Sequence, residues 1–450
     1  MHNTSKNMLE RGLDNIQHPL SGFARAQTTS SLFLLAATIT ALWWANSEFF
    51  VSYFNLVFTP IRIILGEFEL QTSVKHIMND GLMVVFFFLL GLEIKREILA
   101  GDLALSENRR MLVLCAVGGM VCPAAIYSLF NWSLDSQIGW GIPMATDTAF
   151  ALGVLTLVRK HIPASLLAFI VGLAIVDDVG AILVIAIFYT EQISILYLAG
   201  AFALIVFLAA ANYAGIRHPL FYLIFGIAAW WMTLKSGIHP TFAGVAIAMT
   251  IPARPQSASG KILHRAKAVI ISMQKKAGIF DVLGNRHDHE LVQEVRNFAE
   301  RAGTPLRRWE DILSLPVALL ILPLFALINA GVHFDMARVG SDILHPTGLG
   351  IITGLVLGKF IGISGTCWLG LRYNIGRLPE NVTLQHVIGA SLIAGMGFTM
   401  STFIATLGFD TQQENLHIAK TAIMVASILA AVIGVIYFRI IAAVQKPVIL

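Results

Sequence analysis

The sequence predicts an all-α polytopic membrane protein with twelve transmembrane helices. Apolar residues make up 56% of its 450 residues and charged residues make up 13%, about half of the ~25% that is usual in soluble domains. The mean hydropathy is +0.74. Because a water-facing surface requires more charge than this, the composition excludes several soluble domains joined in series.

Twelve predominantly apolar runs follow one another along the chain, and a bilayer-spanning helix requires ~20 such residues. No apolar signal-peptide core precedes the first run, so we expect this run to act as the targeting signal and to remain in the mature protein. Two of the runs are short and lie close together. The runs are 31–51, 77–98, 111–130, 138–158, 164–188, 193–213, 219–234, 238–252, 312–333, 348–371, 384–407 and 421–441.

The mixed charges of a long polar segment, 253–311, indicate a solvated linker or a small helical insert. Its His287-Asp-His-Glu290 resembles a set of metal ligands, but alternate positions on a helix point apart, so chance composition is the better interpretation. The expected segments are a cytoplasmic N-terminal segment at 1–30, helices one to eight at 31–252, the polar segment at 253–311, helices nine to twelve at 312–441 and a cytoplasmic tail at 442–450.

The basic residues orient the chain. If the N-terminus is cytoplasmic, fourteen Lys and Arg outside 253–311 fall in cytoplasmic segments and five fall on the opposite side. Cytoplasmic loops carry the excess of Lys and Arg in membrane proteins, so we expect both termini in the cytoplasm. The net charge of +4 then reflects topology. No basic domain with interleaved aromatic residues appears, which argues against a nucleic-acid partner.

Four ionisable residues lie at mid-depth in the predicted helices: Asp147, Asp177, Asp178 and Lys359. A charged group near the bilayer centre costs several kcal/mol, so a functional role is the first interpretation. Adjacent positions on a helix point ~100° apart, so Asp177 and Asp178 cannot share one face. We expect one to pair with Lys359 and the other to face a cavity with Asp147, where a carboxylate would exchange a proton for a cation. The alternative, a purely structural Asp–Lys bridge, needs only one acid.

Two apolar runs contain helix breakers at the same depth, Gly139-Trp-Gly-Ile-Pro-Met-Ala-Thr-Asp-Thr148 and Gly395-Met-Gly-Phe-Thr-Met-Ser401. Freed backbone at this depth is tolerated only where it lines a cavity or is buried in protein. Interrupted segments in corresponding parts of two halves indicate the midplane site of a transporter. Asp147 would offset the positive N-terminal helix ends there. Simple packing kinks are the alternative.

Other charged residues carry weaker signals. Asp80 and Glu93 lie near the two ends of the second run, where a side chain can reach the interface. Glu93 and Glu97 flank Lys95-Arg96, as expected at a solvated mouth. His239 lies at the start of the eighth run and is either an ordinary polar anchor or a group that titrates near neutral pH.

Several small residues are assigned packing roles. A glycine recurs every four residues in the tenth run, at Gly350, Gly354, Gly358 and Gly362. Such a glycine ladder lets the backbone of another helix approach closely. Because Lys359 adjoins Gly358, the ladder would hold its amine in a tightly packed interior. The cysteines lie inside apolar runs without metal-ligand spacing and are expected to be apolar packing residues: Cys115, Cys122 and Cys367.

Together these features resemble the NhaA family of bacterial sodium/proton antiporters. The resemblance runs in family order over roughly residues 15–440. It rests on 79–88 (NDGLMVVFFF), 91–97 (GLEIKRE), 145–153 (ATDTAFALG), 174–182 (AIVDDVGAI), 235–239 (KSGIH), 322–332 (LPLFALINAGV), 357–360 (LGKF) and 395–401 (GMGFTMS). The chain departs from the family in its longer 253–311 segment and in Leu313-Ser-Leu-Pro316, where the family often has His-Pro-Trp after its acidic residue.

The resemblance implies inverted-topology repeats and two interrupted helices that cross at mid-membrane. By position, Asp178 and Asp177 match the family's essential aspartate pair, and Asp178 is the usual cation ligand. Asp147 and Thr146 match the site on the first interrupted helix, so sodium is expected at Asp178 and Asp147. Lys359 matches the lysine that pairs with Asp177.

Further residues take family roles by position. Glu93, Glu97 and Glu310 match positions linked to pH response at the cytoplasmic funnel, and His239 matches one at the opposite end. We assign structural roles to four more residues: Asp80, Gly358, Gly395 and Gly397.

The implied activity is pH-regulated, electrogenic exchange of sodium or lithium for inward protons by alternating access, in the bacterial inner membrane. No cofactor is expected, because the ligands are the transported Na+, Li+ and H+. The expected partners are these ions and the lipid bilayer. A second copy of the chain is also expected, since family members can form homodimers. No Gly-rich phosphate-binding motif indicates a pump, so a secondary transporter is expected, not an enzyme. The alternatives are a passive cation channel and an intramembrane aspartyl protease, although the latter expects single aspartates on two helices, typically within Gly-x-Gly-Asp.

Overall fold

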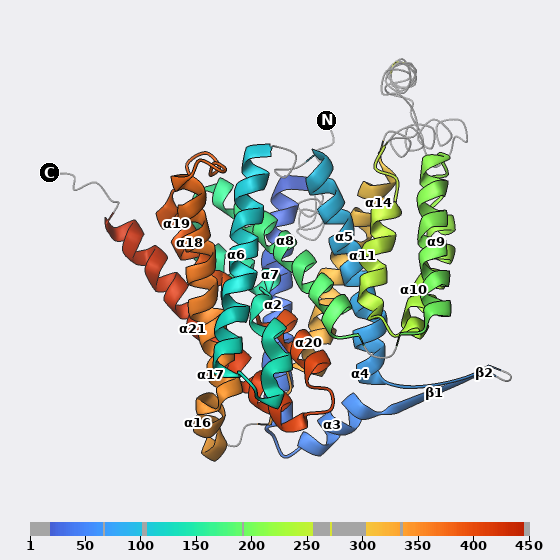
Figure 1. Ribbon diagram of the computed structural model, residues 1–450, viewed down its shortest axis with the longest axis horizontal. Coiled ribbons are helices and arrows are strands. Elements are labelled where there is room, and N and C mark those ends of the chain that lie inside the picture. Colours follow the sequence, from blue (N-terminus) through green and yellow to red (C-terminus); the bar gives the residue numbers. More distant parts are fainter. Residues whose placement is uncertain are drawn as a thin grey trace, which may run out of the picture.

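The computed structural model describes residues 19–65, 68–100, 106–190, 193–254, 271, 303–333 and 336–444, and these are almost entirely helical (Figure 1). Up to the long polar segment the elements are α2 (Pro19–Ala45), α3 (Phe50–Phe58), β1 (Pro60–Leu65), β2 (Phe68–Ser73), α4 (Val74–His76), η1 (Ile77–Leu82), α5 (Met83–Ala100), α6 (Ser106–Phe130), η3 (Asp135–Met144), α7 (Thr148–Leu157), η4 (Arg159–His161), α8 (Ala164–Phe188), α9 (Ile195–Tyr213), α10 (Pro219–Ser236) and α11 (Pro240–Thr250).

After that segment follow α14 (Pro305–Pro316), η5 (Val317–Ile321), α15 (Leu322–Asn329), α16 (Met336–Leu344), α17 (Pro346–Thr353), η6 (Gly354–Gly358), α18 (Lys359–Arg372), α19 (Leu384–Ala394), α20 (Phe398–Gly408) and α21 (Gln413–Val444). The elements η1, η5 and η6 are π-helical turns inside longer helices, whereas η3 and η4 are 3₁₀ helices.

The helices confirm a polytopic membrane protein. Seven in the described part of the chain are long and apolar enough to cross a bilayer, and counting each bent helix pair as one span gives up to ten. The seven are Val74–Ala100, Asn108–Phe130, Ala164–Phe188, Ile195–Tyr213, Pro305–Asn329, Pro346–Arg372 and Gln413–Ala443.

The segment boundaries differ from the sequence prediction most in two places. Helix α2 already begins at Pro19, although the predicted first run begins at residue 31. Helix α14 begins at Pro305 and continues through η5 into α15, so the last part of the predicted 253–311 insert belongs to a membrane helix. Most of that insert, including His287-Asp-His-Glu290, lies outside the described residues, as do residues 1–18 and 445–450.

A β-hairpin corrects the prediction of an all-α chain. Strands β1 and β2 pair antiparallel, from Pro60 opposite Ser73 to Leu65 opposite Phe68. In Figure 1 this hairpin extends away from the helices at the lower end of the view. Residues 68–72 alternate apolar or β-branched and polar side chains, which is the period of a strand and not of a helix.

Two helix pairs bend sharply where the sequence carries its glycines and proline. The pair η3 and α7 bends by 46°, and the pair α19 and α20 bends by 48°. Between the members of each pair lie 145–147 and 395–397, which are buried. Because Pro143 removes a backbone donor and glycine lowers helix stability, neither stretch continues as one regular helix.

The glycine ladder packs α18 and η6 against α6, which confirms its packing role. A Cβ atom at Gly358 would lie 2.7 Å from the Cα of Pro123, and one at Gly362 would lie 2.1 Å from the carbonyl oxygen of Gly118. Only residues without a side chain permit this approach. The ladder thereby fixes Lys359, the first residue of α18, deep in the interior, where it is fully buried.

Candidate functional site

Asp147 caps the N-termini of two helices at once. It is the N-cap of α7, where its Oδ1 accepts a hydrogen bond from the backbone N–H of Phe150 at 3.1 Å. Its Oδ2 accepts from the backbone N–H of Thr399 at 2.8 Å, in the first turn of α20, and from the Thr399 hydroxyl. Free N–H groups and the helix dipole make both helix ends positive, so a single carboxylate compensates both.

Further hydrogen bonds join the two breaks. The N–H of Asp147 donates to the carbonyl of Met396 at 2.6 Å, and the hydroxyl of Thr146 donates to the carbonyl of Ala394 at 3.0 Å. The hydroxyl of Ser401 donates to the carbonyl of Ile142 at 2.8 Å. The carbonyl ends of η3 and α19 are therefore satisfied by groups of the opposite pair, as buried backbone requires.

Gly397 permits this contact. A Cβ atom there would lie 2.9 Å from the carbonyl oxygen of Ala145 and 2.1 Å from the hydroxyl of Ser401, and one at Gly395 would lie 2.6 Å from the carbonyl oxygen of Leu355. The structural role predicted for Gly395 and Gly397 therefore has a direct geometric basis.

Asp177 and Lys359 form a buried ion pair between α8 and α18. The Lys359 Nζ donates to Asp177 Oδ2, and the Thr146 hydroxyl donates to the same oxygen at 2.7 Å. Asp177 is 3% exposed and Lys359 is fully buried. Thr146 thus connects the first break to the ion pair, while Lys359 supplies the compensating charge that a buried carboxylate requires.

Asp178 is the acid of this group that accepts no hydrogen bond from any described residue. It is 3% exposed, and its Oδ1 has no hydrogen-bond partner among the described residues. Its carboxylate interacts electrostatically with Asp177, Asp147, Glu93 and Lys359. Three acids and one lysine therefore share a buried region, and Asp178 is placed to bind a proton or a small cation.

The structure brings together five predicted residues: Thr146, Asp147, Asp177, Asp178 and Lys359. Sequence reasoning missed Thr399 and Ser401, although both lie in the glycine-rich stretch that was singled out. A hydroxyl residue within the first turn after a helix break is a recurrent donor or acceptor at helix ends, and that position was the available signal.

The acidic residues predicted for pH response form a second group, around Arg96. Its guanidinium forms an ion pair with Glu310 and another with Glu97 at 2.8 Å. Arg307 lies 3.5 Å from Glu310, and Glu93 interacts electrostatically with Arg96. Helix α14 therefore contacts the end of α5 through a network that contains Glu93, Glu97 and Glu310 together.

His239 lies apart from that group, beside Asp80. Its Nε2 is 3.6 Å from Asp80 Oδ1, and its Nδ1 lies 2.8 Å from the Thr241 hydroxyl at the start of α11. The ring packs edge-on against Phe403 of α20 at 5.4 Å between centroids. Asp80 and His239 thus belong to one contact between η1 and α11.

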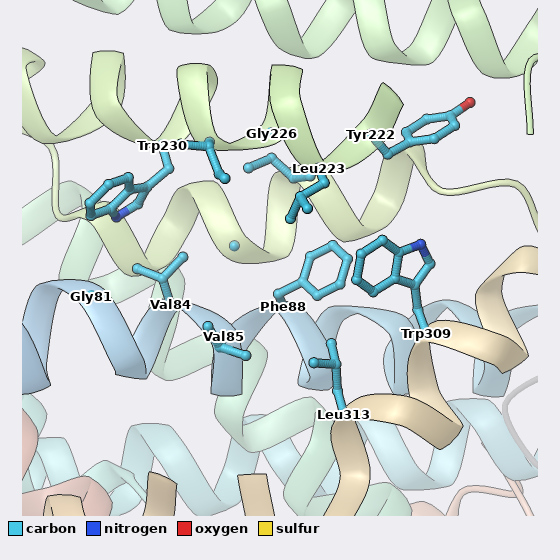
Figure 2. A pocket seen from close by; sticks show the side chains of 13 residues that line it. Gly81, Val84, Val85, Phe88, Tyr222, Leu223, Gly226, Trp230, Trp309 and Leu313 are labelled. Atoms are coloured by element: carbon cyan, nitrogen blue, oxygen red, sulfur yellow. The ribbon is translucent and has the colours of Figure 1, made fainter. Parts of the chain in front are cut away.

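An apolar pocket lies apart from these groups. It has a volume of about 300 Å³ and lies between α5, α10, α11 and α14 (Figure 2). Its lining includes Phe88, Val84, Leu223, Trp230 and Trp309 and none of the candidate site residues.

Within the described residues no group of three or more His, Cys, Asp or Glu side chains is placed to hold a metal ion. The three cysteines are free thiols, and Cys115 and Cys367 are buried.

Comparisons with known proteins cover nearly the whole chain. The family model described as Na+/H+ antiporter 1 matches residues 21–438. The Na(+)/H(+) antiporter NhaA 1 of Shewanella denitrificans is 68% identical over 98% of this chain and 98% of its own length. NhaA 2 of Psychromonas ingrahamii is 66% identical over 99% and 94%, and NhaA of Sulfurimonas denitrificans is 40% identical over 96% and 98%.

Proposed function

The chain belongs to the Na+/H+ antiporter 1 family and is a sodium/proton antiporter, and we propose that it exports sodium or lithium in electrogenic exchange for inward protons, with Asp178 as the group for which the ions compete. It is a transporter in a membrane and not an enzyme.

The unpartnered carboxylate of Asp178 carries this proposal. Both oxygens of Asp147 accept hydrogen bonds from helix ends, and Asp177 is paired with Lys359. Asp178 alone of the three has no donor bonded to it in the described part of the chain. Sodium takes oxygen ligands, so Asp178 supplies the first ligand and Asp147 supplies negative charge nearby.

Competition at one carboxylate accounts for the coupling. A buried carboxylate without a counter-ion is unfavourable, so Asp178 holds either a proton or a cation, but not both. Sodium binding from one side expels the proton, and protonation on the other side releases sodium. No phosphorylation or cofactor is needed for this exchange.

The two bent helix pairs support a midplane site with alternating access. We infer that η3–α7 and α19–α20 are interrupted membrane helices that cross within inverted repeats of a twelve-helix fold in the bacterial inner membrane, with both termini cytoplasmic. The bonds from Asp147 and Thr146 to α19 and α20 would keep the crossing intact while the surrounding helices move. Discontinuous helices at mid-depth are typical of such sites.

The Arg96 group is the proposed site of pH regulation. Glu93 interacts electrostatically with both this group and Asp178. Protonation of Glu93, Glu97 or Glu310 would therefore change the charge near the cytoplasmic path to the site. We place this group at the cytoplasmic end because the positive-inside rule assigns Lys95 and Arg96 to that side.

The test is sodium-driven proton movement in everted membrane vesicles across pH 6.5–9, with sodium, lithium and potassium compared. Wild-type chain should move protons on addition of sodium or lithium, and Asp178→Asn should not. Asp135→Asn, an exposed acid on η3, is the matched control and should behave as wild type. Unchanged proton movement in Asp178→Asn would refute the site, and sodium flux without proton movement would indicate a channel.

A further inference from the structure

The hydroxyl of Thr148 is a buried polar group that the proposed exchange does not use. Thr148 is the first residue of α7 and directly follows Asp147, the N-cap of that helix. Its Oγ1 is buried and has no hydrogen-bond partner among the described residues. Burial of a hydroxyl without a hydrogen bond is unfavourable, so such a group beside a binding site indicates a ligand that completes it.

Other buried threonines in the helices avoid this cost. The hydroxyls of Thr38, Thr402 and Thr406 each donate to the backbone carbonyl four residues earlier in the same helix. Thr148 has no such carbonyl in its own helix, because the residue four positions earlier, Met144, belongs to η3 on the other side of the break. The interruption of the helix therefore leaves this hydroxyl free.

The packing of α7 places Thr148 on the face that meets α8. The short connection at 158–163 makes the two helices antiparallel neighbours. Thr148 lies three, four and seven residues before the buried apolar residues of α7, so it shares their face. These residues pack in one cluster with residues of α8: Ala151, Leu152 and Leu155 of α7 with Leu166, Phe169, Ile170 and Leu173 of α8.

The depth of Thr148 follows from its neighbour in the break. The Thr146 hydroxyl donates to Asp177 Oδ2 at 2.7 Å, so the start of α7 lies beside the middle of α8. Two residues of chain span at most ~7 Å, and Thr148 is two residues after Thr146. Thr148 therefore lies on the α8 side of α7 at the level of Asp177 and Asp178.

Three side-chain oxygens of this region have no hydrogen-bond partner among the described residues: Asp177 Oδ1, Asp178 Oδ1 and Thr148 Oγ1. Other oxygens of the site are already bonded. Asp177 Oδ2 accepts from Lys359 and Thr146, and both oxygens of Asp147 accept from helix ends. Hard cations take oxygen ligands, and the free oxygens are the ones that can bind a cation without loss of a hydrogen bond. Thr148 supplies the neutral member of this set.

We propose that the Thr148 hydroxyl is a ligand of the transported cation. This inference rests on the proposed function, in which the cation and the proton compete at Asp178, and it adds an oxygen that serves only the cation. A proton on Asp178 forms one O–H bond and needs no further ligand, whereas sodium or lithium needs several oxygens. Thr148 therefore shifts the competition at Asp178 toward the cation.

Three substitutions at Thr148 separate the hydroxyl from the rest of the side chain. Thr148→Val keeps the shape and removes the oxygen, Thr148→Ala removes the oxygen with a smaller side chain, and Thr148→Ser keeps the oxygen. Thr156→Val is the matched control, because the Thr156 hydroxyl lies in the same helix and donates to the carbonyl of Gly153 at 2.6 Å.

The experiment titrates the purified full chain with sodium chloride and then lithium chloride, and it measures both the protons released and the heat of cation binding. Thr148→Val and Thr148→Ala should need about tenfold more sodium for half-maximal proton release, or ~1.4 kcal/mol of binding free energy. The number of protons released at saturation should equal that of wild type, because the carboxylates remain. Thr148→Ser and Thr156→Val should match wild type.

Half-maximal sodium concentrations for Thr148→Val and Thr148→Ala equal to that of wild type would overturn the inference and leave the proposed function intact. The same rise in Thr148→Ser would also overturn it, because that variant retains the oxygen. A lower melting temperature of the two hydroxyl-free variants without any change in sodium binding would assign Thr148 to packing alone. Wild-type protein that releases no protons with sodium would instead refute the proposed function, and the inference with it.

Discussion

Asp147 and Thr399 are 252 residues apart in the chain, yet the backbone N–H and the hydroxyl of Thr399 both donate to one carboxylate oxygen of Asp147. The other oxygen of Asp147 caps its own helix. One buried acid therefore holds the N-termini of α7 and α20 together. The contact between the two bent helix pairs is a polar structure inside an apolar protein, and the Thr146 hydroxyl connects it to Asp177 of α8.

Removal of the Thr399 hydroxyl should weaken this contact without abolishing it. Thr399→Val deletes one hydrogen bond to a charged group, which is worth about 1.5–3 kcal/mol, and leaves the backbone bond in place. We expect a lower melting temperature of the purified protein in detergent. Thr402→Val is the control, because the Thr402 hydroxyl donates to the Phe398 carbonyl of its own helix. Equal melting temperatures for the two variants would contradict this role for Thr399.

Loss of Lys359 should destabilise the protein more strongly. Lys359→Ala leaves the buried Asp177 carboxylate without its cation, and breaking such a pair typically costs about 3–5 kcal/mol. Asp177→Asn in the same chain removes the uncompensated charge and should restore much of the loss. Thermal unfolding of the two single variants and the double variant measures this coupling. A double variant no more stable than Lys359→Ala would show that the pair is not the source of the effect.

The packing of η6 predicts a difference between two glycines of neighbouring segments. Gly358→Ala places a methyl group against Pro123 and should cost about 1–3 kcal/mol through overpacking. Gly365 lies in α18, and a Cβ atom added there would have no described atom within 4 Å. Gly365→Ala should therefore be neutral or slightly stabilising, because alanine favours a helix. Melting temperatures of both variants decide the matter. A Gly358→Ala protein as stable as wild type would mean that η6 and α6 are not tightly packed.

The Arg96 group predicts the shape of the pH response. Glu310→Gln removes one ionisable partner of Arg96, so fewer protons are exchanged when the group titrates. The pH dependence of sodium-driven proton movement should become less steep, with little change in maximal rate. Glu414→Gln, an exposed acid at the start of α21, should leave the profile unchanged. An unaltered profile for Glu310→Gln would remove α14 from the proposed pH response.

Much of this site could be predicted from the sequence because charges and helix breakers are conspicuous in apolar runs. The depth of the two adjacent aspartates and of Lys359 within long runs indicated a buried acid–lysine pair, which the resemblance assigned to Asp177. The glycines at 395 and 397 marked a break. The sequence could not predict that Thr399 donates hydrogen bonds to Asp147. Thr399 is one of many hydroxyl residues, and its contact with Asp147 depends on how two distant helices pack. The hairpin at 60–73 was missed because a search for long apolar runs passes over a short alternating pattern.

The same limit applies to a polar contact between three distant residues, in which the Lys420 Nζ donates to the carbonyl of Asn329 and the Asn329 side chain donates to Asn79 Oδ1. Asn79, Asn329 and Lys420 come from three separate segments, and each alone is an ordinary residue near a helix end. Only their packing shows that the Lys420 Nζ donates to the backbone carbonyl of Asn329. Contacts between distant elements are therefore what the structure adds to the residue pattern.

Proton release on sodium binding tests the central claim most directly, because it asks whether the two ions compete at Asp178. Purified wild-type protein in weakly buffered detergent solution should release protons when sodium or lithium is added, and Asp178→Asn should release none under the same conditions. Sodium binding by wild type without proton release, or equal release by Asp178→Asn, would contradict the claim.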